Sequence, residues 1–131
     1  MPVARTLTTL VVDDQLTIRA LVRNGLEQLG VTEIVEAEDG EQGLRVMLTG
    51  FPPPKLIISD YNMPKFDGIS LLRAIRMHPA TKTTPFIMLT GRADKELVLS
   101  AAKYGVNNYL AKPFTVPTLK EKIEAVLGAL T

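Results

Sequence analysis

Five side chains that could act together on a metal ion or an anion each stand directly after a short apolar run. They are three carboxylates, one hydroxyl and one ammonium group: Asp13, Asp14, Asp60, Thr90 and Lys112. If these runs are parallel strands, their carboxyl ends meet at one rim of a sheet, where open α/β folds bind ligands. Two carboxylates about 5 Å apart repel by roughly 3 kcal/mol at an effective dielectric of 20. Such a cluster needs a cation, and oxygen ligands suit Mg²⁺ better than zinc.

The apolar runs alternate with segments of helical periodicity. We expect strands at 7–12, 33–37, 56–59, 86–89 and 107–110. We expect helices around 18–29, 43–49, 69–75, 97–102 and 119–130, several of them ended by a glycine. This repeated βα order predicts a five-stranded parallel sheet with helices on both faces. The length fits one domain over residues 1–131, and because the last expected helix ends with the chain, no output domain is expected.

Composition narrows the possible functions. The chain has no cysteine, which excludes a disulfide scaffold, a thiolate zinc site and cysteine nucleophile chemistry. The net charge of +1 gives no reason to expect nucleic acid as a partner. No apolar run approaches the length of a membrane span, so we expect a cytoplasmic protein without membrane contact. Residues 1–67 carry a balance of −4 and residues 68–131 one of +5, which is either chance or a sign of an acidic partner for the second half.

Each candidate residue alone has an ordinary structural explanation. An aspartate after a strand can cap the next helix or form a turn, and a lysine is usually solvated. Their joint placement at four strand ends favours a site. A mononucleotide or flavin site would have backbone donors from a Gly- or Ser/Thr-rich loop after the first strand, but here that loop is acidic. His78, the single histidine, is expected to cap a helix or to be solvated.

At this point four motifs in chain order carry a resemblance over nearly the whole chain. They are Val11-Val12-Asp13-Asp14, Asp60-Tyr61-Asn62-Met63-Pro64-Lys65-Phe66-Asp67-Gly68, Thr90-Gly91, and Tyr109-Leu110-Ala111-Lys112-Pro113-Phe114. Together they resemble the receiver domain of bacterial response regulators, and most closely the stand-alone chemotaxis regulators of that family. The resemblance implies a flavodoxin-like receiver fold with strand order 2-1-3-4-5.

The resemblance also implies a role for each site residue. Asp60 would be the phosphoacceptor, which takes a phosphoryl group from the phosphohistidine of a partner kinase. Asp13, Asp14 and Asp60 would hold Mg²⁺ together with the backbone carbonyl of Asn62. The metal would neutralise charge so that an anionic nucleophile can approach an anionic phosphoryl group. Such a protein is not an enzyme in the usual sense, because it catalyses only its own phosphorylation and dephosphorylation.

Further residues would read the phosphoryl group. Lys112, followed by a cis peptide to Pro113, would pair with phosphoryl oxygens, and Thr90 would hydrogen-bond one of them. The added charge would draw Thr90 inward and let the Tyr109 ring turn in. This would change the face that is expected to bind a partner, with Lys95, Tyr109 and Lys122.

Two positions differ from the familiar pattern of the family. Gly91 stands where alanine is common, and it is still small enough to admit a phosphodonor. Arg92 stands where the chemotaxis relative has an acid, which leaves the rate of dephosphorylation and any dependence on a phosphatase open.

The leading functional hypothesis is a monomeric signalling receiver, phosphorylated by a CheA-like histidine kinase and acting on the flagellar motor switch or another protein target. A phosphorelay shuttle or a phosphate sink would share every site residue. An aspartate-nucleophile phosphatase or a flavin protein are more remote alternatives. The phosphatase signature needs a second aspartate where this chain has Gln15.

Overall fold

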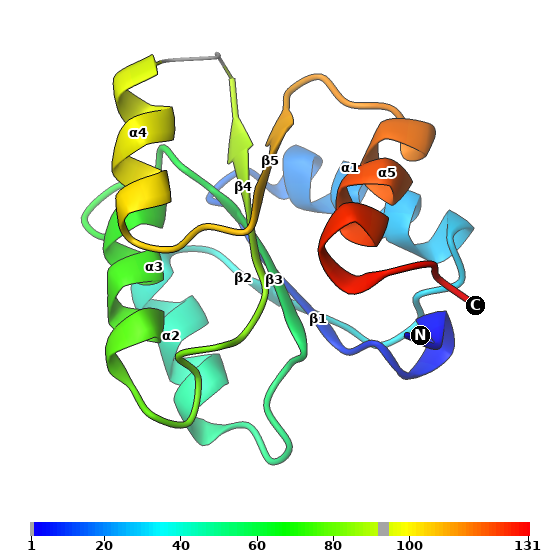
Figure 1. Cartoon of the computed structure of the whole chain (residues 1–131), viewed down its shortest axis with the longest axis horizontal. Helices are drawn as coiled ribbons and strands as arrows, with labels where there is room; N and C mark the ends of the chain where they lie inside the picture. The colour runs from blue at the N-terminus through cyan, green and yellow to red at the C-terminus, as the bar shows by residue number, and fades with distance from the viewer. Residues whose placement is uncertain (1, 92–94) are drawn as a thin grey trace.

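The computed structural model describes residues 2–91 and 95–131, and within them one parallel sheet forms the centre of the molecule (Figure 1). Its strands are β1 (Thr9–Val12), β2 (Ile34–Ala37), β3 (Leu56–Asp60), β4 (Phe86–Thr90) and β5 (Asn108–Ala111). They are ordered β2-β1-β3-β4-β5, and every neighbouring pair runs parallel. The expected strand order is confirmed, and all five carboxyl ends therefore meet at one rim.

The helices cover the sheet on both faces. Figure 1 shows α1 (Leu16–Gln28) and α5 (Val116–Leu127) on one face, and α2 (Gly40–Thr49), α3 (Gly68–Met77) and α4 (Lys95–Lys103) on the other. The three central strands β1, β3 and β4 are buried on both sides, as in other parallel sheets that lie between helix layers, whereas the edge strands β2 and β5 are partly exposed. In the described residues no helix is both long and apolar enough to cross a membrane.

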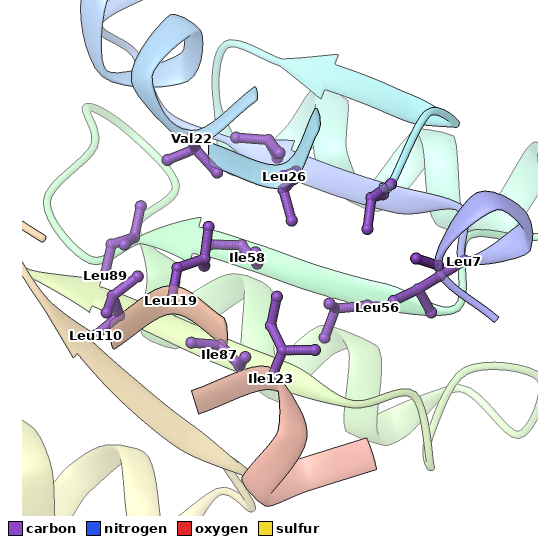
Figure 2. Close-up of a cluster of buried hydrophobic side chains, with 13 residues drawn as sticks. Leu7, Val22, Leu26, Leu56, Ile58, Ile87, Leu89, Leu110, Leu119 and Ile123 are labelled. Carbon is purple, nitrogen blue, oxygen red and sulfur yellow. The ribbon is translucent and has the colours of Figure 1, made fainter. Parts of the chain in front are cut away.

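The side chains of each strand alternate between two hydrophobic clusters. Figure 2 shows the cluster under α1 and α5, where Ile58 and Ile87 of the sheet lie close to Leu119 and Ile123 of α5. The opposite cluster packs the other strand residues against α2, α3 and α4. Burying one such leucine or isoleucine stabilises the fold by about 1.5–3 kcal/mol. Hydrophobic packing on both faces of the sheet therefore fixes the strands whose carboxyl ends form the rim.

Several predicted boundaries are wrong by one to three residues, and two of them have a clear local reason. The strand expected from Leu7 begins at Thr9, because Ala4–Thr6 form a short 3₁₀ turn, although Leu7 is buried as predicted. The helix expected at 43–49 begins at Gly40, because the Asp39 side chain caps it by accepting the Gln42 backbone N–H at 2.8 Å. The hydrophobic periodicity of the sequence therefore predicts which residues are buried better than it predicts where a capped helix begins.

The last helix does not continue to the end of the chain. It ends at Leu127, because Gly128 adopts a φ of 88°, a conformation that favours glycine. Beyond it, the Leu130 backbone N–H donates to Glu124 Oε2 at 2.8 Å, and that of Thr131 donates to Pro2 O at 3.0 Å. The two termini therefore lie side by side, and the apolar Leu130 packs against the core without being helical.

Candidate functional site

Three aspartates meet at the carboxyl rim of the sheet. β1 leads directly into Asp13 and Asp14, and Asp60 is the last residue of the neighbouring strand β3. One carboxylate oxygen from each residue lies within 4.8 Å of the other two. Asp13 and Asp60 are buried, whereas Asp14 is exposed. The structure thus brings together the three carboxylates that the strand ends predicted.

Asp13 has its polar groups fixed from three directions. Its backbone N–H donates to Ala37 O of β2 at 3.1 Å, and its carbonyl accepts from Arg19 Nη1 at 2.7 Å. Its carboxylate Oδ1 accepts the Gln15 backbone N–H at 2.9 Å. The remaining oxygen, Oδ2, is buried and lacks a hydrogen-bond partner in the described part of the chain. A buried acceptor without a donor is rare in folded proteins and points to an ion or ligand.

The electrostatics of the cluster favour a cation. The pKa of Asp13 is raised to about 6, chiefly by burial and also by the Asp60 and Asp14 carboxylates. The hydrogen bond from the Gln15 N–H and the charge of Lys112 act in the opposite direction on this pKa. A cation bound beside Asp13 would therefore stabilise the ionised form of its carboxyl group. The donors of the site are all oxygens, as hard divalent cations such as Mg²⁺ prefer. These residues fit Mg²⁺ on burial, charge and donor type.

Lys112 supplies a positive charge at the same rim. Its Nζ donates to Asp60 Oδ1 at 2.9 Å and lies 3.9 Å from Asp13 Oδ2, too far for a hydrogen bond. Its backbone N–H donates to Thr90 O at 2.7 Å, which fixes the start of the loop between β5 and α5. The peptide bond from Lys112 to Pro113 is cis, as the resemblance implied.

A solvent-accessible cavity of about 560 Å³ opens above the cluster. Asn62, on the loop after β3, is exposed and lines this cavity with Asp14, Asp60, Lys112 and Gly91. A Cβ atom added at Gly91 would meet nothing within 4 Å, so this position leaves the entrance open.

The residues expected to switch line a neighbouring cavity of about 350 Å³. It contains Thr90 at the end of β4, Tyr109 of β5 and Lys122 of α5. The Tyr109 hydroxyl donates to Val98 O of α4 at 2.7 Å, and burial raises the pKa of this phenol. The structure brings Thr90 and Tyr109 together beside the acidic cavity, at the junction of α4, β5 and α5.

Two residues of the sequence analysis cannot be placed in these cavities. Arg92 lies outside the described residues. Lys95 begins α4, but its side chain also lies outside the described part of the structure. His78 is exposed directly after α3, as expected for a solvated or capping residue.

Sequence reasoning missed two residues that act on Asp13. Gln15 acts through its backbone N–H, which any residue type except proline would offer. Arg19 is only 9% exposed and contacts a backbone carbonyl. An arginine within the apolar period of a helix was the signal that could have found it.

Comparison with known proteins agrees with this geometry. The model of the response regulator receiver domain matches residues 9–124. A probable chemotaxis protein CheY of Rhizobium etli is 51% identical over 130 residues, which is 99% of each chain.

Solved structures agree as well. The chemotaxis response regulator CheY4 of Vibrio cholerae superposes with a TM-score of 0.83 at 33% identity, over 92% of this chain and 98% of that one. The receiver domain of the sensor histidine kinase PA1611 from Pseudomonas aeruginosa, with a magnesium ion coordinated in its active-site cleft, has a TM-score of 0.82 at 28% identity, over 93% and 98%. The acidic rim, the strand order and these matches show that the chain belongs to the response regulator receiver family.

Proposed function

We propose that this chain is a stand-alone chemotaxis response regulator of the cytoplasm, and that Asp60 accepts a phosphoryl group from a histidine kinase. One observation carries the assignment of Asp60. It is the buried carboxylate at the end of the central strand β3, and it alone both accepts a hydrogen bond from Lys112 Nζ, at 2.9 Å, and belongs to the three-aspartate cluster of the described residues. The Rhizobium relative, which matches over 99% of its own length, is named for chemotaxis, and this supports the chemotaxis assignment.

Mg²⁺ would be held by Asp13, Asp14 and Asp60, with the backbone carbonyl of Asn62 completing the protein ligands. When bound, the metal supplies the positive charge that lets an anionic carboxylate approach an anionic phosphoryl group. The unpartnered Oδ2 of Asp13 and the magnesium ion in the similar Pseudomonas receiver support this set.

The transfer itself makes one bond and breaks one bond. A carboxylate oxygen of Asp60 forms the new P–O bond as the P–N bond to the kinase histidine breaks, and the imidazole leaves with the electron pair. Lys112 would pair with the phosphoryl oxygens, since its ammonium already lies at Asp60. Thr90 would hydrogen-bond one of these oxygens and couple the site to Tyr109 through the cavity that both residues line.

The output would be a change in affinity for a protein target such as the flagellar motor switch. Tyr109 and Lys122, together with Lys95, would form the docking face, and the chain would act as a monomer. A phosphatase could shorten the lifetime of the acyl phosphate.

Phosphorylation of Asp60→Asn by acetyl phosphate tests the proposal. We expect the wild-type chain to be labelled in the presence of Mg²⁺ and the variant to take no label, because an amide is a poor nucleophile. Asp67→Asn is the matched control: Asp67 caps α3 by accepting the Ser70 N–H at 2.8 Å, and asparagine caps equally well. Labelling of Asp60→Asn, or undiminished labelling of the wild type in excess chelator, would contradict the assignment.

A further inference from the structure

A buried arginine lies directly behind the acidic rim. Arg19, on α1, is 9% exposed, although a guanidinium is costly to remove from water. Its Nη1 donates to the carbonyl of Asp13 at 2.7 Å and its Nε donates to Glu36 Oε1 at 3.0 Å. One side chain therefore joins the end of β1 to the edge strand β2.

Glu36 is itself shared between two arginines of α1. Its other oxygen, Oε2, accepts from Arg23 Nε at 2.8 Å, and Arg23 also donates to Ile34 O at 3.2 Å. Hydrogen bonds from both arginines lower the pKa of Glu36 against the effect of its burial. Glu36 thus remains ionised, and its carboxylate holds the guanidinium group of Arg19 in one orientation.

The contact with Asp13 bears on the geometry of two cluster residues at once. The Asp13 carbonyl belongs to the same planar peptide as the N–H of Asp14. A donor that holds this carbonyl in place therefore also fixes the orientation of the peptide plane from which the Asp14 backbone starts. Asp13 also donates its N–H to Ala37 O and accepts the Gln15 N–H, so that among the described residues Oδ2 is the one polar atom of Asp13 without a hydrogen-bond partner.

The charge of Arg19 and its hydrogen bond to Asp13 should have opposite effects on the affinity for a cation. The positive charge of Arg19, at the backbone carbonyl of Asp13, repels an entering cation, so its removal should tighten cation binding if electrostatics were its whole contribution. If Arg19 acts by fixing the Asp13–Asp14 peptide, its removal should weaken binding instead. The two explanations differ in sign.

We propose that Arg19 is a positioning residue for Mg²⁺ binding, which acts through the Asp13 carbonyl and is itself oriented by Glu36. The inference deepens the proposed function and rests on it for the identity of the cation. Residues that orient metal ligands from behind typically change metal affinity by 10- to 100-fold when replaced.

The test is a Mg²⁺ titration of the full chain at constant ionic strength, followed by calorimetry and by the backbone amide signals of Asp14 and Gln15. For Arg19→Met we expect the Mg²⁺ dissociation constant to rise about tenfold. For Arg19→Lys, which keeps the charge but cannot donate to both acceptors, we expect a rise of about threefold. Urea unfolding of the same samples measures any loss of global stability.

Arg23→Met is the matched control. It removes the same charge from the same helix and also takes a partner from Glu36, but Arg23 does not contact Asp13. We expect its Mg²⁺ affinity to stay within about twofold of the wild type.

An unchanged or tighter affinity of Arg19→Met would overturn the inference, and so would equal weakening by Arg23→Met. If Arg19→Met does not fold, Arg19→Lys decides: wild-type affinity in that variant overturns the inference. Labelling of the wild type by acetyl phosphate is measured in parallel. If labelling fails while the affinity pattern is as expected, the proposed function is wrong and the positioning role stands.

Discussion

At the scale of single residues, the ionised carboxylate of Asp13 destabilises the metal-free fold, although the same carboxylate is suited to bind a cation. Its carboxylate is buried among like charges, and burial raises its pKa from 3.8 to about 6. The folded state therefore binds this proton more tightly than the unfolded state does. As pH rises from about 4 to about 6, the metal-free fold loses stability through this group, and the loss is complete above that range.

Replacement of Asp13 by asparagine should remove this cost. In chelator near neutral pH we expect Asp13→Asn to raise the free energy of unfolding by roughly 1–2 kcal/mol, since the Gln15 hydrogen bond to Oδ1 can persist. The difference should vanish below about pH 4, where both forms are neutral. Urea unfolding from pH 4 to 8 measures it.

Mg²⁺ should reverse the order of stability of the wild type and Asp13→Asn. Millimolar Mg²⁺ is expected to stabilise the wild type and to leave Asp13→Asn nearly unchanged, because only the wild type keeps the buried carboxylate. A variant that is less stable than the wild type in chelator at neutral pH would show that the carboxylate stabilises the fold by some other contact.

The charged residues at the rim could be predicted from the sequence, but the residues that hold them in position could not. Asp13, Asp14, Asp60 and Lys112 could be predicted because strand ends converge in a parallel sheet. Arg19 could not, because its contacts are to a carbonyl and to a residue on another strand. Such contacts depend on register rather than on residue type.

At the scale of elements, the connection from β3 to α3 shows how tightly a helix start is fitted to the site. Gly68, the first residue of α3, donates its N–H to Tyr61 O at 2.9 Å. A Cβ atom there would collide with the carbonyl oxygen of Asp60 and come within 2.7 Å of Met88 Sδ and 2.9 Å of Tyr61 Cα. Backbone atoms cannot move aside cheaply, so glycine is required for the close approach.

Gly68→Ala is therefore expected to lower the free energy of unfolding by about 1–3 kcal/mol, the usual cost of overpacking. Gly91→Ala is the matched control, because a Cβ atom at Gly91 meets nothing within 4 Å and its φ is not in the left-handed region. That variant should stay within about 0.5 kcal/mol of the wild type. Urea unfolding of both variants checks this, and equal stabilities would mean that the loop after Asp60 yields easily.

The alternation of elements was readable from sequence, whereas their ends were not. All five strands and five helices occur in the described residues where the two periodicities predicted them. The start of α2 depends on the Asp39 cap and the end of α5 on the conformation of Gly128. Hydrophobic periodicity carries no information about either, because Leu130 is packed against the core without being helical.

At the scale of the whole molecule, one sheet connects the acidic rim to a second surface. β4 ends in Thr90, beside the cluster, and its neighbour β5 carries Tyr109. The Tyr109 hydroxyl is bonded to Val98 O, so the ring ties β5 to α4. Under the proposed function, an inward movement of Thr90 would change the cavity that these residues share with Lys122, and with it the surface proposed to bind a partner.

This coupling predicts how binding to a flagellar motor switch protein should depend on the state of Asp60. With a stable phosphoryl mimic we expect affinity to rise, and Tyr109→Ala to reduce the ratio between the two states toward one, because the ring reports the change. Lys122→Glu should weaken both states and lower the salt dependence, because charges at the edge of an interface mainly set the rate of association. Lys82→Glu, an exposed change of the same charge between α3 and β4, is the control and should have little effect. Equal affinity of the two wild-type states would make this chain a phosphate sink or shuttle, and state-dependent binding that ignores both variants would place the partner on another face.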